Sequence, residues 1–224
     1  MPGQIKIDDG AGNYTVLTNG GSLGSDKTIT IPNTTGTMAL TSDISPSGLV
    51  KIATATASSS TELLFDNFVD LSTYPSYYLV FRQIKASNDN TELRFKFRTG
   101  GASGSDLTGL YPQGGVYWHG DATGGAIFEN AGQTDFSTME NGLGNADAEA
   151  LVADGYLYPA TGTASTSNVN IYNYKIHKQM YNDTVRTIER TTFHESTVTV
   201  TGIKFYMSAG NIASGTIDIY GVKS

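Results

Sequence analysis

Apolar and polar residues alternate with a period of two in residues 27–44. Ile29 and Ile31 are separated by threonine, a Pro-Asn-Thr-Thr-Gly run interrupts the pattern, and Met38 and Leu40 then resume it. A period of two places every second side chain on one face of a β-strand, and the interrupting residues favour a turn. The segment therefore predicts two short strands around a turn.

The whole N-terminal region repeats this layout of short strands and tight turns. Ile5 and Ile7 precede an Asp-Asp-Gly turn, and Tyr14 and Val16 follow it. We treat residues 1–45 as one unit, which has too little apolar area to form a monomeric domain. Two interpretations stay open. In one, copies of the chain wind into an attachment stem with Ile29, Ile31, Met38 and Leu40 in contact; in the other, the unit is a flexible arm.

Longer strands are predicted from residue 46 onward, after a Ser-Pro-Ser-Gly linker. Such strands with intervening turns favour an all-β fold, in which residues 46–224 form a β-sandwich or jelly-roll head. The strand candidates are Leu49–Thr56, Tyr77–Ile84, Glu92–Arg98, Val169–Tyr174, Thr184–Arg190, Val198–Met207 and Thr216–Val222, with weaker signals at Leu63–Phe65 and Gly115–Trp118.

Composition agrees with this fold class. Glycine accounts for 26 of 224 residues, and sustained helical periodicity is almost absent. The only helix-like stretch is residues 146–153, where Asn145 could serve as the N-cap. We expect one or two helical turns there.

The strand around Phe95 has a clear two-faced pattern. Leu93, Phe95 and Phe97 should face the core, while a basic row of Arg94, Lys96 and Arg98 should face away from it. Because the protein is acidic overall, the groups that neutralise this basic row have to be identified. The row is either a solvated sheet face, which we favour, or a surface that pairs with the acidic residues of the segment between Arg98 and Lys175, within the chain or across a trimer interface.

The 76 residues between Arg98 and Lys175 contain no Lys or Arg, but eight carboxylates and 14 glycines. We interpret this basic-free segment as long loops on the sandwich, because glycine and Asn/Asp residues serve turns. Loops of such length are often functional.

The densest aromatic stretch lies within this segment. Tyr111, Tyr117, Trp118 and Asp121 could form a glycan patch, because aromatic rings stack on the apolar faces of sugars while polar groups bind hydroxyls. The competing interpretation, which we favour, is that Trp118 simply fills the core. Asn88-Asp89-Asn90 could offer oxygen ligands to a cation, but a hairpin turn is the simpler interpretation.

Several functions are disfavoured by the sequence. A net charge of −7 argues against nucleic-acid binding, and the absence of cysteine excludes disulfides and thiolate metal sites. The histidines His119, His177 and His194 lie in separate segments without metal-site or catalytic spacing. No apolar run is long enough to span a membrane, and residues 1–4 do not resemble a signal peptide. We expect no cofactor, no metal and no enzymatic activity.

The segment from Thr28 to Asp43 resembles the TITLPN-x-TGT-x-AL-T-x-D element of tail fibre and related virion fibre proteins of tailed bacteriophages, particularly those of marine and cyanobacterial hosts. Ile31 and Met38 stand where such proteins often have leucine. Residues 213–223 are similar to the closing strand of many such fibre heads. The resemblance implies a homotrimeric virion component, made in the host cytoplasm and attached to other virion proteins.

The sequence thus leads to three functional hypotheses. The first is a tail fibre whose head binds the host surface, with a cell-surface glycan as the expected partner. The second is a head fibre or capsid decoration protein that seats on the shell and stabilises it. A weaker third is a polysaccharide-degrading spike, for which two carboxyl groups would have to lie about 5 to 9 Å apart.

Overall fold

The structure is a computed structural model that describes residues 5–8, 11, 14–17, 48–120, 125–160, 169–179, 185–195 and 199–223. The expected stem contacts Ile29, Ile31, Met38 and Leu40 lie outside the described residues, as does Asp121. The chain divides into two compact units, Met1–Ile44 and Ser45–Ser224, which are described separately.

The N-terminal unit contains one antiparallel strand pair. Strand β1 (Ile5–Asp8) pairs with β2 (Tyr14–Leu17) in a register that places Ile5 opposite Leu17 and Asp8 opposite Tyr14. The two strands coincide with the alternating residues that the sequence places on either side of the Asp-Asp-Gly run, and β1 ends at Asp8, the first residue of that run.

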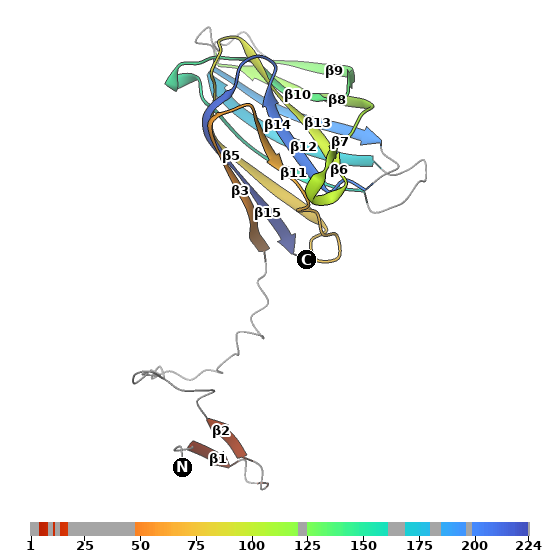
Figure 1. The fold of residues 1–224 in the computed structure, drawn as a ribbon. Helices are drawn as coiled ribbons and strands as arrows, with labels where there is room; N and C mark the ends of the chain where they lie inside the picture. The colour runs from red at the N-terminus through yellow and green to blue at the C-terminus, as the bar shows by residue number, and fades with distance from the viewer. Residues whose placement is uncertain are drawn as a thin grey trace. The chain divides into compact units, whose positions relative to one another are not determined.

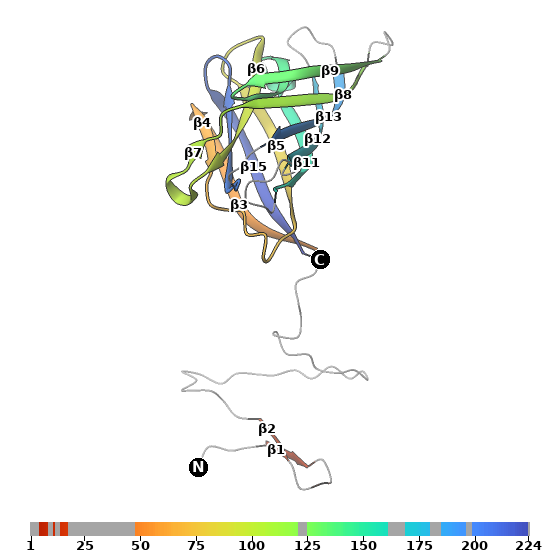
Figure 2. The same ribbon diagram turned by 90° about the vertical axis from the view of Figure 1, so that its right-hand side faces the viewer.

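The second unit is all-β, and its larger sheet has eight antiparallel strands (Figures 1 and 2). Long alternating runs rich in β-branched and aromatic residues form these strands. In spatial order they are β3 (Gly48–Ser60), β15 (Ile212–Lys223), β5 (Ser76–Ala86), β11 (Leu151–Tyr158), β12 (Val169–Gln179), β13 (Val185–Glu195), β8 (Leu110–His119) and β9 (Gly125–Thr134).

A smaller antiparallel sheet of five strands covers one face of the larger sheet. Its strands run in the order β10 (Ser137–Leu143), β6 (Thr91–Thr99), β14 (Gly202–Met207) and β4 (Glu62–Phe65), while β7 (Ser105–Asp106) pairs with β6. All seven main strand candidates and both weaker ones correspond to strands of these two sheets.

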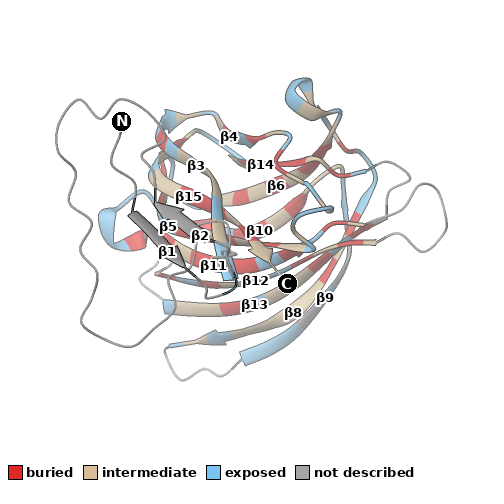
Figure 3. Ribbon diagram, turned by 90° about the horizontal axis from the view of Figure 1, so that it is seen from below, coloured by how far each residue is buried: buried red, intermediate tan, exposed pale blue. Residues whose placement is uncertain are grey.

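The two sheets meet in a single core built around Phe95 of β6. Buried positions, red in Figure 3, alternate with less buried ones along the strands. The Phe95 ring lies edge-on to Tyr172 of the larger sheet, with centroids 5.4 Å apart, and Phe205 of β14 meets Phe81 of β5 at 5.0 Å. Such edge-to-face contacts add to the free energy of burial. The prediction that Leu93, Phe95 and Phe97 face the core is confirmed, since all three are fully buried.

Of the one or two helical turns expected in residues 146–153, the structure contains one, and the rest of the segment leads into a strand. A single 3-10 turn, η2 (Asp147–Glu149), is followed directly by strand β11. Alternation explains the strand, because residues 151, 153, 155 and 157 are buried while residues 152, 154 and 156 are less buried. Pairing with β5 and β12 on both sides outweighs the helix propensity of the alanines.

The basic-free segment is also mostly strand rather than loop. Its residues form β7, β8, β9, β10 and β11, which contribute to both sheets. One of its glycines is required by the sheet itself, because a Cβ atom on Gly115 would collide with the backbone carbonyl of Glu189 in the neighbouring strand. Glycine content here therefore reflects close strand packing as well as turns.

The first and last strands of the second unit are neighbours. Strand β3 pairs with β15 so that Gly48 lies opposite Lys223. The chain therefore enters and leaves this unit at the same point of the larger sheet, beside the C label in Figure 1.

Candidate functional site

Tyr111 belongs to the core. It is fully buried, its hydroxyl donates a hydrogen bond to the Leu107 carbonyl at 3.1 Å, and it accepts one from the Phe97 N–H at 3.1 Å. Burial raises the pKa of this phenol above its ordinary value. Tyr111 cannot contact a glycan in this arrangement, so its place in the expected patch is wrong.

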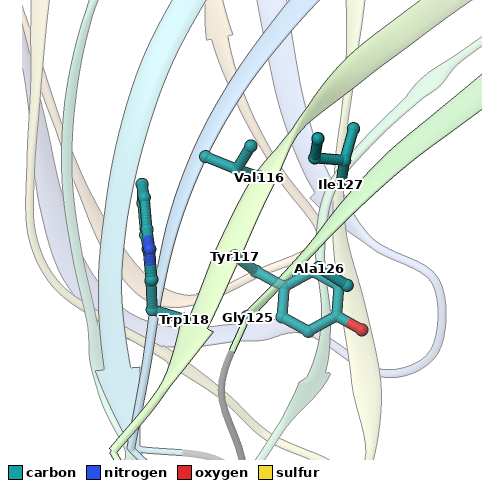
Figure 4. Close-up of a pocket in the computed structure, with 6 residues that line it drawn as sticks. All are labelled: Val116, Tyr117, Trp118, Gly125, Ala126 and Ile127. Carbon is teal, nitrogen blue, oxygen red and sulfur yellow. The ribbon is translucent and has the colours of Figure 1, made fainter.

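Trp118 lies on the surface, so the favoured interpretation that it fills the core is wrong. Its side chain is 46% exposed on the outward face of β8, where a pocket of about 270 Å³ lies against β9 (Figure 4). Ile127 on β9 is 79% exposed beside it. The pocket is lined by Val116, Tyr117, Trp118, Gly125, Ala126 and Ile127, and its only polar side-chain groups are the Tyr117 hydroxyl and the Trp118 indole N–H.

Tyr117 points away from Trp118, because successive side chains of a strand alternate between faces. Figure 4 shows the two rings on opposite sides of the strand. Tyr117 packs against the core, with the Arg186 guanidinium 5.1 Å from its ring centroid. Sequence reasoning therefore located a real surface feature at Trp118, but the expected residues do not form one site.

A row of tyrosines crosses the outward face of the larger sheet. Cross-strand register places Tyr220 of β15 opposite Tyr78 of β5, and Tyr78 opposite Tyr156 of β11. The ring centroids of Tyr78 and Tyr156 are 4.8 Å apart, and those of Tyr156 and Tyr158 are 6.3 Å apart with nearly parallel planes. We call Tyr220, Tyr78, Tyr156 and Tyr158 the tyrosine row.

Polar side chains border the tyrosine row at a shallow pocket of about 280 Å³. The pocket is lined by Asp154, Gly155, Tyr156, Asn173, Tyr174, Lys175 and Glu189. The Lys175 ammonium contacts the Glu189 carboxylate at 2.8 Å, and the Asn173 amide donates to the Thr191 hydroxyl at 3.0 Å. These groups can donate and accept hydrogen bonds directly beside an exposed ring.

The surroundings of the Tyr78 hydroxyl favour its protonated form. Burial, together with the neighbouring Asp154 carboxylate, raises the pKa of Tyr78 to about 12. The phenol is therefore protonated at neutral pH. It remains a hydrogen-bond donor beside Asp154 rather than a second negative charge.

Asp218 lies next to Tyr220 on the same outward face and is covered by cationic side chains. Its carboxylate contacts the Lys51 ammonium at 2.7 Å, accepts a hydrogen bond from the Thr54 hydroxyl at 2.6 Å and pairs with Arg82. Burial alone would raise the pKa of Asp218, but the hydrogen bonds from Lys51 and Thr54 and the Arg82 charge outweigh it and lower the pKa. The cluster of Asp218, Lys51 and Arg82 therefore carries a net formal charge of only +1.

The outward face of the smaller sheet carries the basic row. Asp106, from the basic-free segment, contacts Lys204 at 2.5 Å and Lys96 at 3.7 Å and also pairs with Arg98. Arg98 additionally contacts Asp66 at 2.6 Å. Lys96 and Arg98 therefore pair with the basic-free segment within the chain, as the second interpretation predicts, whereas Arg94 pairs with Glu92 of its own strand.

A further ion pair is buried between the sheets. Glu140 of β10 contacts the Lys178 ammonium of β12 at 2.9 Å, and both side chains have no exposed surface. Arg186 approaches the same carboxylate at 3.6 Å. Burial lowers the pKa of Lys178, although the Glu140 charge offsets part of this effect. The pair joins the two sheets without reaching solvent.

The three histidines remain apart in the structure. His177 lies on the outward face beside the Thr187 hydroxyl at 3.0 Å, and His194 packs against Tyr111 in the core with centroids 4.4 Å apart. Across the described ranges, no group of three or more His, Asp or Glu residues could hold a metal ion.

No helix in the described part of the chain is long and apolar enough to cross a membrane.

No family model, curated protein or solved structure matches this chain.

The features that sequence reasoning missed are Tyr78, Tyr156 and Tyr158. The signal for two of them was present, because Tyr156 and Tyr158 are separated by one buried leucine, but they lay at the end of a segment that we expected to be helix and loop.

Proposed function

We propose that this chain is a virion fibre protein of a tailed bacteriophage whose head binds the host surface without enzymatic activity. In this proposal the chain forms a homotrimer, and residues 1–45 form the stem that mounts it on other virion proteins. Residues 46–224 form a β-sandwich head of jelly-roll type. The resemblance of residues 28–43 and 213–223 to fibre proteins supports the virion assignment.

One observation of the structure carries the binding role. The larger sheet presents exposed aromatic rings beside hydrogen-bonding side chains on rigid, fully paired strands. Exposed aromatics held by a rigid scaffold are typical of recognition surfaces, since they bring large contact area at little cost in conformational entropy. In a trimer, three such surfaces would raise a weak single-site affinity through avidity.

The location of the protein on the particle tests the assignment. Immunogold electron microscopy with an antibody against the head should label the tail fibres of particles released by cells that carry this gene. Labelling of the shell would replace the host-binding role with that of a head fibre or capsid decoration protein. An absence of label on intact particles, with label on the purified protein, would overturn the virion assignment.

Assembly of the stem gives a second test. Light scattering at micromolar concentration should report a trimer for the full-length chain, because residues 1–45 have too little apolar area to fold alone. Deletion of residues 1–44 should leave a folded head. A monomeric full-length chain with residues 1–44 protected from proteolysis would contradict the trimeric stem.

A further inference from the structure

The strongest unassigned feature of the head is the tyrosine row with its neighbouring polar pocket. Tyr156 and Tyr158 are 41% and 44% exposed, and their nearly parallel rings stand on one strand. Tyr78 lies on the adjacent strand, and its ring contacts the Tyr156 ring. We call the three neighbouring rings of Tyr78, Tyr156 and Tyr158 the aromatic platform.

The polar groups beside the platform determine which ligand fits it. The pocket adds two carboxylates, Asp154 and Glu189, one ammonium group of Lys175 and the amide of Asn173. The lysine is already paired with Glu189. The pocket therefore carries a formal excess of one negative charge, which repels anionic ligands.

We infer that Tyr156, Tyr158 and the pocket formed with Asp154, Asn173 and Lys175 bind a neutral saccharide chain. A pyranose ring has one apolar face and a rim of hydroxyl groups. The apolar face stacks on the Tyr156 ring, and the hydroxyls exchange hydrogen bonds with carboxylate, amide and ammonium groups at the rim. The inference deepens the proposed host-binding function and takes its biological role from it.

The Trp118 pocket fits this ligand less well. Apart from the hydroxyl of Tyr117, whose ring packs against the core, the only polar side-chain group in its lining is the Trp118 indole N–H, which donates but cannot accept a hydrogen bond. Stacking with this single donor would leave most of the hydroxyl rim of a sugar without partners, and desolvated polar groups without hydrogen bonds are costly. The tyrosine row offers both kinds of contact within a few ångströms.

The chain provides a matched control for the platform. Phe193 on β13 also lies on the outward face and is 39% exposed, close to the exposure of Tyr156. The pocket beside Tyr156 does not include Phe193. Truncating either ring removes a similar amount of exposed aromatic surface, but only one change removes the platform.

The test is isothermal titration of the full-length protein with four hexasaccharides: maltohexaose, cellohexaose, mannohexaose and, as the anionic probe, hexagalacturonate. At least one neutral probe should bind, and hexagalacturonate should not. Tyr156→Ala should weaken binding by about tenfold or more, and Asn173→Ala by a similar factor, whereas Phe193→Ala should change it by less than about twofold. Thermal unfolding should show that all variants are folded.

Three results would overturn the site. They are failure of all three neutral probes at millimolar concentration, equal affinity of wild type and Tyr156→Ala, and equal losses in Tyr156→Ala and Phe193→Ala. Protection of Tyr156 from iodination in the assembled protein would also overturn it, because a second copy of the chain would then cover the platform.

A parallel measurement separates the site from the proposed function. If wild-type protein and Tyr156→Ala adsorb equally to host cells, host binding stands and the tyrosine site falls. If wild-type protein binds a neutral hexasaccharide in a Tyr156-dependent way but adsorbs to no host cell, the site stands and the attachment function falls.

Discussion

The head has two outward faces that are built by the same alternation of side chains but carry different chemistry. On the smaller sheet, Arg94, Lys96 and Arg98 of β6 point outward and meet carboxylates of the same chain. On the larger sheet, the outward positions of β5 and β11 carry the tyrosine row. The first face satisfies its own charges, whereas the second leaves aromatic surface open to solvent.

This difference indicates where a ligand would gain most. A ligand on the smaller sheet would have to displace existing ion pairs, such as Arg98 with Asp66, and gain little in exchange. A ligand on the larger sheet would cover the partly exposed rings of Tyr156 and Tyr158, and burial of that apolar surface is favourable. Charge density alone is therefore a poor guide to a binding face in this molecule.

The core beneath both faces should show the largest mutational effect. Phe95→Ala removes a fully buried ring that contacts Tyr172 and Phe205, so the free energy of unfolding should fall by about 3 to 5 kcal/mol. Phe193→Ala on the outward face should cost less than about 1 kcal/mol. Urea unfolding monitored by circular dichroism measures both. Similar losses for the two variants would contradict the assignment of inner and outer faces.

The buried ion pair should be nearly as sensitive. Glu140→Gln leaves the Lys178 ammonium without its carboxylate in the interior, and we expect a loss of about 3 to 5 kcal/mol at pH 7. Burial lowers the folded-state pKa of Lys178 below its unfolded value, so folding disfavours the charged form of this lysine relative to the unfolded chain. The defect should therefore shrink as the pH rises from 7 toward the unfolded pKa of about 10.4.

Urea unfolding of wild type and Glu140→Gln between pH 7 and pH 10 measures this recovery. Lys175→Gln on the outward face breaks an exposed ion pair with Glu189 and serves as the control. A Glu140→Gln defect that stays constant or grows with pH would show that Lys178 is not the charge responsible.

The charged face of the smaller sheet should respond more moderately. Asp106→Asn leaves Lys96, Arg98 and Lys204 with less neutralisation, and its partly exposed position predicts a loss of about 1 to 3 kcal/mol. Burial would raise the pKa of Asp106, but contacts with Lys204, Arg98 and Lys96 outweigh it and lower the folded-state pKa. The stabilisation by Asp106 is thus present above the unfolded pKa, near 4, and is lost as the pH falls through the folded-state value.

Unfolding of wild type and Asp106→Asn at pH 7 and at progressively lower pH checks both statements. The two stability curves should converge below about pH 4, because protonation of Asp106 in the wild type removes the same charge. A gap that persists unchanged into acid would mean that packing, rather than charge, accounts for the loss.

Most of the strand positions could be predicted from the sequence, because alternation is a local property of residues such as Leu93, Phe95 and Phe97. Within the basic-free segment, however, the sequence could not predict which side chains face the core and which face solvent. Tyr111 and Trp118 lie on one strand seven residues apart, and only cross-strand pairing decides that Tyr111 points inward and Trp118 outward. A one-residue change of register would exchange these faces.

The tyrosine row was out of reach for a related reason. Tyr220, Tyr78 and Tyr156 come from three distant parts of the chain, and neighbouring positions in the sheet bring them together. Local pattern cannot supply such long-range pairing. The partner of the basic row was easier to predict, since the eight carboxylates of the basic-free segment indicated that one of them, such as Asp106, would meet it.

The smallest expected effect is that of Lys96→Ala, and it sharpens the comparison between the two faces. The Lys96 ammonium lies 3.7 Å from Asp106, farther than Lys204 at 2.5 Å. Strand register also places Lys96 directly opposite Lys204, so removal of Lys96 relieves a like-charge contact. These terms oppose each other, and the free energy of unfolding should change by less than about 1 kcal/mol. Lys204→Ala, which removes the closer partner, should cost more. If Lys96→Ala destabilised the head as much as Asp106→Asn does, the basic row would be a cooperative network in which no single cation can be spared.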